Sequence, residues 1–188
     1  MHVQQIRRTS VPLAATDARP LVVGFLALQF FTGYEWLMSG LSKVAAGDFA
    51  SGLAATLADM TKDQSGWYKS FVDGVVIPNG QLFGTLVILG ELGVGLALVA
   101  SACTWLARWS QMRYRNRTML VAGVAVVAAL GCVMSLNFHL AMGAPAPWTL
   151  SPDPNDQGVD LDSLMVVMQL VLVATSLRYL AILRRENR

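Results

Sequence analysis

Two glutamates, Glu35 and Glu91, each interrupt a long apolar stretch of the sequence. A carboxylate inside a membrane span costs at least about 2.5–3.5 kcal/mol, so such a residue marks a functional site by default. The rise of an α-helix places Glu35 about 9 Å and Glu91 about 13 Å below the same surface of the predicted membrane. We therefore expect a functional role for these two carboxyl groups. The alternative is that each carboxyl only forms hydrogen bonds that fix helix packing.

Lys43 follows Ser39 by four residues and Glu35 by eight, so the three side chains share one stripe of a helix. A lysine at the end of such a stripe can bind an anionic substrate. Lysines at the end of a membrane span also extend their ammonium groups to the interface without any function. Both interpretations of Lys43 stay open on the sequence alone.

Three further polar residues belong to the same predicted layer. Asn137 and His139 end the third apolar stretch, and Gln169 lies in the first half of the fourth. Side chains on facing helices build the ligand sites of helix bundles, so we expect these residues to join Glu35 and Glu91. The alternative for His139 is an interfacial histidine whose hydrogen bonds are satisfied within the protein.

The histidine and cysteine content excludes several redox sites. Only His139 lies at membrane level, whereas a heme with two histidine ligands needs two. Cys103 is predicted near the inner end of one span and Cys132 near the middle of the next, too far apart for a disulfide. We therefore expect no metal site and no covalently bound cofactor.

The composition indicates that these residues belong to a membrane protein. The chain has 188 residues, of which 54% are hydrophobic and only 14% charged, against about 25% charged in a typical soluble domain. The net charge of +2 argues against a nucleic-acid partner. We predict a single all-α membrane domain over residues 1–188, an antiparallel bundle of four transmembrane helices in the lipid bilayer. The predicted spans are residues 20–42, 81–106, 118–141 and 161–182.

The basic residues orient this bundle. Every arginine lies in the N-terminal segment, in the 107–117 loop or toward the C-terminus, whereas the lysines lie on the other side. Because basic loops stay in the cytoplasm, both termini and the 107–117 loop are predicted to be cytoplasmic. Residues 43–80 and 142–160 are then the outer loops.

Apolar residues in the first outer loop recur at helical spacing, which predicts short helices that lie on the outer membrane surface or cap the bundle. The second outer loop contains several prolines, which predict an irregular segment. The predicted apolar faces of the short helices are Phe49, Leu53, Leu57 and Met60, then Trp67 or Tyr68, Phe71 and Val75. The predicted N-caps of the last three spans are Asn79, Asn116, and Asp160 or Asp162.

Two short motifs resemble the DoxX/DoxD family of small four-helix membrane proteins. The first span ends in Gly40-Leu-Ser-Lys43, which is similar to the Gly-x-x-Lys ending of that family. The second span contains Gly90-Glu91 and then Gly95, which is similar to the family's Gly-Glu-x-x-x-Gly stretch. The resemblance covers roughly residues 20–140 and is nearest to the DoxD-like branch, because the first outer loop is long.

The resemblance implies a membrane subunit of a redox complex in a bacterial or archaeal inner membrane. DoxD belongs to thiosulfate:quinone oxidoreductase, which acts together with a second small subunit. By this resemblance Lys43 would attract an anionic substrate, and Glu91, with Glu35 or His139, would take up protons as quinone is reduced. Trp36 and Phe30 would stack near the quinone ring, with Asn137 and Gln169 as further binding residues.

A different class of function is also consistent with the sequence. The chain would then be a non-catalytic subunit that anchors or scaffolds a larger membrane complex. Small residues at helix-contact spacing on the second and third spans, together with the predicted outer helices, motivate this alternative. Whether the chain is itself an enzyme stays open at this point.

Overall fold

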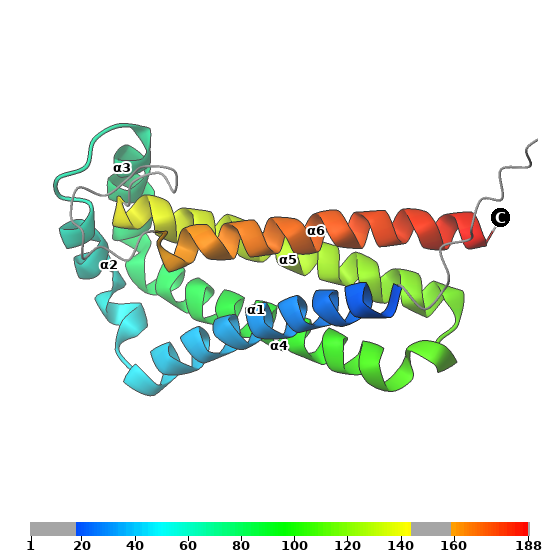
Figure 1. Ribbon diagram of the computed structural model, residues 1–188. Helices are drawn as coiled ribbons and strands as arrows, with labels where there is room; N and C mark the ends of the chain where they lie inside the picture. The colour runs from blue at the N-terminus through cyan, green and yellow to red at the C-terminus, as the bar shows by residue number, and fades with distance from the viewer. Residues whose placement is uncertain (1–17, 144–158, 188) are drawn as a thin grey trace, which may run out of the picture.

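The computed structural model describes residues 18–143 and 159–187, and every regular element in these ranges is helical. Four long helices lie side by side and alternate in direction, so that α1 begins where α6 ends (Figure 1). Each is long and apolar enough to cross a membrane, which confirms the predicted four-helix membrane bundle. They are α1 (Ala18–Ala46), α4 (Gly80–Arg108), α5 (Tyr114–Met142) and α6 (Leu161–Glu186).

The bundle consists of two helix pairs, α1 with α4 and α5 with α6. Glycines bring α1 and α4 close together. A Cβ atom at Gly33 would lie 2.7 Å from the Cβ of Leu98, and one at Gly95 would lie 2.8 Å from the carbonyl oxygen of Gly33. Small residues permit this approach in membrane helices. The close contact fixes the rotation of α1 and therefore decides which of its side chains face the interior.

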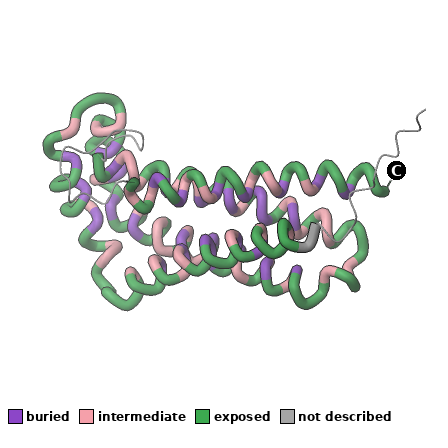
Figure 2. The backbone as a smooth tube through the Cα atoms, in the orientation of Figure 1, coloured by how far each residue is buried: buried purple, intermediate pink, exposed green. Residues whose placement is uncertain are grey.

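The outward faces of the four helices are apolar, whereas the buried positions follow their inward faces (Figure 2). In water such a surface would be unfavourable, but in a bilayer it contacts lipid tails. The chain is therefore a multi-pass membrane protein by its described structure. Large exposed apolar residues include Leu21, Phe31, Leu89, Leu96, Val126 and Leu170.

Four short helical elements cover one end of the bundle, which we call the capped end (Figure 1). Leu53 and Leu57 of the first of them are buried in one apolar cluster with Val72 and Val76. The predicted short helices are therefore present, and of the two placements left open by the sequence they adopt the one that caps the bundle. The elements are α2 (Phe49–Met60), α3 (Trp67–Phe71), a π-helical turn η1 (Val72–Val76) and a 3-10 turn η2 (Ile77–Asn79).

The prediction for the buried face of the second short helix is wrong, because the buried residues lie one position after the predicted ones. Val72 and Val76 are the buried residues, whereas Phe71 and Val75 are exposed. The chain passes from α3 into the wider π-helical turn of η1, which displaces the side chains relative to a regular α-helix. The stripe that meets the bundle therefore runs from the partly buried Tyr68 through these two valines.

The starts of the long helices agree only in part with the sequence. Asp160 is the N-cap of α6, and its carboxylate accepts a hydrogen bond from the backbone N–H of Ser163 at 2.9 Å, as predicted. Asn79 precedes α4, but its side chain donates to the carbonyl of Val75 instead. Asn116 is not a cap, because Arg113 already turns the chain into α5 from an extended conformation.

The prediction for the proline-rich second outer loop falls on residues 144–158, which lie outside the described ranges. The cytoplasmic placement of the two termini stays a prediction, since it concerns the orientation of the bundle in its membrane.

Candidate functional site

An ion pair between α1 and α4 lies beneath the capped end. The ammonium group of Lys43 donates to Glu91 Oε1 at 2.8 Å and to Ser39 Oγ at 2.8 Å. The Glu91 side chain is fully buried, whereas that of Lys43 is 20% exposed. Because Lys43 and Ser39 are four residues apart on α1, they reach α4 together. The structure thus brings the end of α1 at Lys43 against the glycine-rich stretch of α4 that contains Glu91.

The other oxygen of this carboxyl group, Glu91 Oε2, is buried without a hydrogen-bond partner among the described residues. Two aromatic rings flank the ammonium group. The Lys43 nitrogen lies 5.2 Å from the ring centre of Phe49 and 6.0 Å from that of Phe138. Rings at these distances stabilise the cation.

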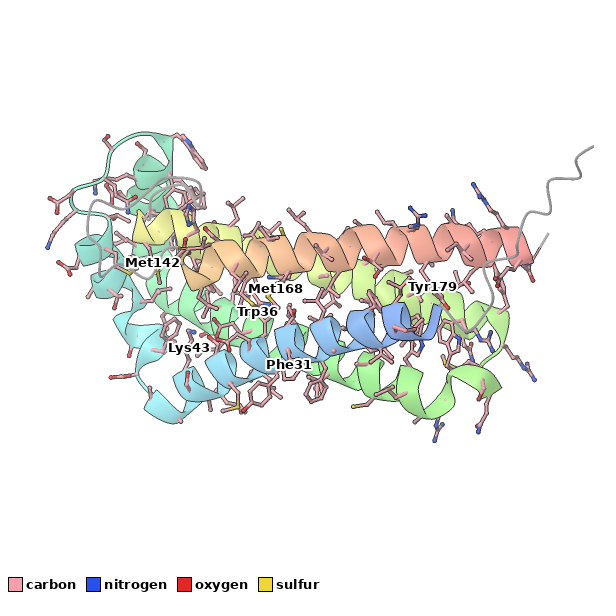
Figure 3. All side chains as sticks on the ribbon, viewed as in Figure 1. Phe31, Trp36, Lys43, Met142, Met168 and Tyr179 are labelled. Atoms are coloured by element: carbon pink, nitrogen blue, oxygen red, sulfur yellow. The ribbon has the colours of Figure 1, made fainter. Side chains whose placement is uncertain are left out.

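A cavity of about 690 Å³ opens above this ion pair, between the capping elements and the ends of the long helices. Its size is that of a typical small-molecule site, and its walls are mostly apolar. Figure 3 shows Lys43 on α1 and Met142 on α5 near this end of the bundle. Prominent apolar lining residues are Phe49, Leu53, Phe71, Val72, Phe83, Met134, Phe138 and Leu161.

Carboxyl groups outnumber cations in the cavity lining. Lys43 is the lining cation, and the lining acids are Glu91, Asp160 and Asp162. Burial alone would raise the pKa of Asp160, but hydrogen bonds from Ser163 and the neighbouring His139 outweigh this effect and hold that pKa below its usual value. The lining therefore offers no excess of positive charge for an anion.

Two predicted binding residues, Trp36 and Gln169, meet one to two helical turns deeper. The Gln169 side chain donates to Ser135 Oγ at 3.0 Å and to the carbonyl oxygen of Met165 at 3.0 Å. A Cβ atom at Gly131 would collide with Gln169 Oε1 and lie 3.2 Å from Trp36 Nε1. Both groups therefore converge on the glycine surface of α5. In Figure 3 Trp36 lies between the helix pairs, whereas Phe31 lies on the outer side of α1.

The remaining predicted residues do not converge on Glu91. His139 Nδ1 lies 3.3 Å from Asp160 and 3.1 Å from the Ser163 hydroxyl, so it ties α5 to α6. Asn137 lines the cavity, but its amide group donates to the carbonyl of Val133 and is exposed. Glu35 is half-buried and forms no hydrogen bond with the described residues. The expected single layer of polar groups is thus divided into separate clusters.

Phe30, which the resemblance places near a quinone ring, lies on the exposed side of α1 and packs edge-to-face on Phe31. Phe49, Phe71 and Phe138 are among the aromatic residues that line the cavity instead. Sequence reasoning missed these three residues because their positions depend on how the capping elements fold back over the bundle. Helical spacing identifies Phe49 as part of an apolar face, but not as a neighbour of Lys43.

Comparisons with known proteins place the chain in no family. The chain matches no family model, and neither the curated proteins nor the solved structures give a match. The function must therefore be argued from the site itself.

Proposed function

We propose that this chain is a quinone-binding membrane subunit of a redox complex, as in the DoxX/DoxD-like proteins that its motifs resemble. One observation carries the proposal. A mostly apolar cavity of quinone-compatible size ends on a buried Lys43–Glu91 pair that can donate hydrogen bonds and exchange a proton.

A quinone ring is neutral and carries two carbonyl oxygens that accept hydrogen bonds. The Lys43 ammonium has three N–H donors, of which two are used by Ser39 and Glu91 within the described residues. The third can bind a quinone carbonyl oxygen. The phenylalanine rings and aliphatic side chains of the cavity then cover the ring and the first part of its apolar tail.

Reduction of a quinone to a quinol adds two electrons and two protons, and each carbonyl oxygen becomes a hydroxyl. In this proposal the Lys43 ammonium gives its proton to the bound oxygen, and the adjacent Glu91 carboxyl group relays a replacement proton from water to Lys43. The other quinone oxygen takes its proton from water at the open side of the cavity. The electrons come from the reductant, which the partner subunit oxidises in this proposal. The present chain thus supplies the quinone site and a proton.

The charged groups that line the cavity favour binding of a neutral quinone over binding of an anionic reductant. Thiosulfate is a dianion, and in this cavity it would meet one ammonium group and three carboxyl groups. We therefore assign thiosulfate, or a similar anionic reductant, to the partner subunit. Binding of such an anion to Lys43 is less favourable than the sequence suggests, because the Lys43 ammonium group already pairs with Glu91.

A second candidate is the non-catalytic anchoring subunit, and Glu35 favours it. This residue is half-buried in the middle part of α1 and has no hydrogen bond to the described residues. A polar group at membrane depth is costly unless it pairs with another polar group. A transmembrane helix of another subunit would supply such a partner. Loss of co-purification on Glu35→Leu, with quinone binding unchanged, would support the anchoring role.

The proposal is tested by titrating the chain in lipid nanodiscs with a soluble quinone analogue. We expect saturable binding that weakens by roughly tenfold or more in Lys43→Met/Glu91→Leu, which lacks the ammonium donor but leaves no uncompensated buried charge, since a hydrogen bond from a charged group contributes about 1.5–3 kcal/mol. Lys69→Met is the matched control, because Lys69 pairs with Asp73 on the surface of the same end. Absence of saturable binding, or equal weakening in both variants, would refute the quinone site.

Turnover is measured on the chain co-expressed with its neighbouring redox subunit. We expect quinone reduction that depends on thiosulfate and is lost in Glu91→Gln, which keeps the shape of the side chain but carries no exchangeable carboxyl proton. Full activity of Glu91→Gln would contradict the role of Glu91 as a proton relay.

A further inference from the structure

The cavity above the Lys43–Glu91 pair extends between the two helix pairs of the bundle. Its lining includes residues of all four long helices and of the capping elements. A cavity of about 690 Å³ encloses a molecule of the size of a quinone ring with a short substituent. Membrane quinones carry tails of several isoprene units, which a cavity of this size does not enclose. A bound membrane quinone therefore has to extend its tail through an opening in the cavity wall.

The charged side chains of the lining are gathered toward α1 and α6. Lys43 belongs to α1, and Asp160 and Asp162 lie at the start of α6. Glu91 of α4 joins this group, because its carboxyl group bonds the Lys43 ammonium. A tail that left the cavity on this side would take charged groups out of water, which is costly. The tail is therefore expected on another side.

The side between α4 and α5 is mostly apolar among the described lining residues. It is formed by Leu86 and Val87 of α4 and by Met134 of α5. Asn137 is a polar residue on this side, and its amide group already donates to the carbonyl of Val133 in its own helix. An apolar tail can pass here without separating a charged pair.

Two lining residues on this side reach the outer surface and mark an opening. Leu86 is 52% exposed, and Asn137 is exposed as well, although both line the cavity. One turn deeper the two helices are in contact, since a Cβ atom at Gly90 would lie 2.9 Å from Met134 Cε. Leu86 precedes Gly90 by four residues and Asn137 follows Met134 by three, so both lie one turn nearer the capped end on the same helix faces. The α4–α5 interface is thus closed at Gly90 and open above it.

The capping elements form the upper edge of this opening. The Tyr68 hydroxyl donates to the carbonyl oxygen of Asn137 at 2.9 Å, which ties α3 to α5. The ring of Phe71 lies 6.5 Å from that of Tyr68, lines the cavity and is exposed. Tryptophan and tyrosine are typical of the interface between bilayer and water, and Trp67 and Tyr68 lie together at this edge. The opening beneath them therefore faces the lipid tails.

We propose that this opening is a lateral mouth through which the cavity takes up quinone from the bilayer. The ring of the bound quinone lies at the Lys43 ammonium, and its tail leaves between Leu86 and Asn137 along the lipid-facing surface. This assignment rests on the proposed quinone site, and it names the substrate as a long-tailed quinone that is drawn from lipid rather than from water.

Two quinone analogues with the same ring test the mouth. One carries only a methyl group, the other an unbranched ten-carbon tail, and both should bind the unmodified chain in nanodiscs. Leu86→Trp fills the mouth, so the long-tailed analogue should bind roughly tenfold or more weakly, whereas the methyl analogue keeps its affinity. Leu96→Trp is the matched control, because Leu96 is exposed on the same helix but does not line the cavity. It should change neither affinity.

The outcomes separate the mouth from the quinone site. If neither analogue binds the unmodified chain, both the site and the mouth are refuted. If both bind and Leu86→Trp weakens them equally or not at all, the mouth is refuted but the site is retained. The second result is also expected if a phospholipid acyl chain occupies the opening. Leu161 of α6 is exposed and lines the cavity as well, so selective loss of the long-tailed analogue in Leu161→Trp alone would place the exit there and overturn the proposal.

A photoreactive group at the end of the tail maps the exit without any substitution. The counted labels are those that an excess of the methyl analogue suppresses, since these depend on a bound ring. We expect them on exposed residues beside the mouth, such as Leu89 of α4 and Val133 of α5. Suppressible labels on Leu164 at the start of α6, with none on α4 or α5, would overturn the proposal. This measurement does not depend on the folding of Leu86→Trp.

Discussion

Replacement of Lys43 by Met should strongly destabilise the bundle. Methionine keeps an unbranched apolar side chain, so the change removes chiefly the charge and its hydrogen bonds. The Lys43 ammonium nitrogen lies 2.8 Å from Glu91 Oε1, and the Glu91 side chain is fully buried. Removal of one partner of a buried ion pair typically costs about 3–5 kcal/mol, because the other charge stays behind without compensation.

A second estimate gives the same magnitude and adds a dependence on pH. The Glu91 carboxyl of the variant can avoid the uncompensated charge by taking up a proton. For an ordinary glutamate this costs about 3.7 kcal/mol at pH 7 but only about 1 kcal/mol at pH 5. We therefore expect a loss of about 4 kcal/mol at pH 7 that shrinks to about 1 kcal/mol at pH 5.

The free energy of unfolding can be measured by titration with a denaturing detergent at both pH values. Lys69→Met is the control, because the exposed pair of Lys69 with Asp73 should contribute less than about 1 kcal/mol at either pH. The double variant Lys43→Met/Glu91→Leu should recover most of the stability, because an apolar pair leaves no buried charge. A loss below about 1 kcal/mol at pH 7, or a loss equal at both pH values, would refute this account of the ion pair.

Three further changes have defined outcomes. Gly33→Ala should separate α1 from α4 and cost about 1–3 kcal/mol in the same unfolding assay, whereas Gly93→Ala, with no neighbouring atom within 4 Å, should be neutral. Asp160→Ala should cost about 1 kcal/mol at neutral pH through loss of the α6 cap. The pKa of Asp160 is held below its usual value, so the stability that its carboxylate adds is complete at neutral pH and disappears as pH falls through that lowered pKa. The stabilities of the variant and the parent protein should therefore converge in acid. Gly131→Ala should displace the Gln169 amide, because the added Cβ would collide with Gln169 Oε1, and should cost about 1–3 kcal/mol in the same assay.

The fold class followed from the sequence because a membrane span leaves a strong one-dimensional signal. Long uncharged stretches predict the four helices, and each predicted span lies within an observed helix, as residues 81–106 lie within α4. The inward face of α2 was also predicted, since Leu53 and Leu57 lie one turn apart. These features depend on local spacing alone.

The pairing of Lys43 with Glu91 could not be predicted in the same way. The two residues are 48 positions apart, and depth along a helix does not give the rotation of that helix. Glycine contacts such as that of Gly33 set the rotation, and they turn Lys43 rather than Glu35 toward α4. The sequence places Glu35 and Glu91 at similar depth. It does not show that Lys43, and not Glu35, is the residue of α1 that pairs with Glu91.

Gln29 and Thr32 were missed, although a signal was present in the sequence. They continue the inward spacing of Trp36 and Lys43, and uncharged polar residues attract less notice than glutamates in an apolar stretch. Only the structure shows that both are fully buried and carry atoms without hydrogen-bond partners among the described residues. Recognising this polar inward face of α1 requires the rotation of the helix as well as its composition.

Photolabelling can show whether quinone binds in the cavity above the Lys43–Glu91 pair. The chain in nanodiscs is irradiated with a photoreactive quinone analogue, and the labelled peptides are identified by mass spectrometry. We expect labels on cavity residues such as Phe49, Met134 and Phe138, which excess quinone suppresses and the double variant Lys43→Met/Glu91→Leu reduces. Labels confined to the lipid-facing residues, unaffected by excess quinone, would contradict it.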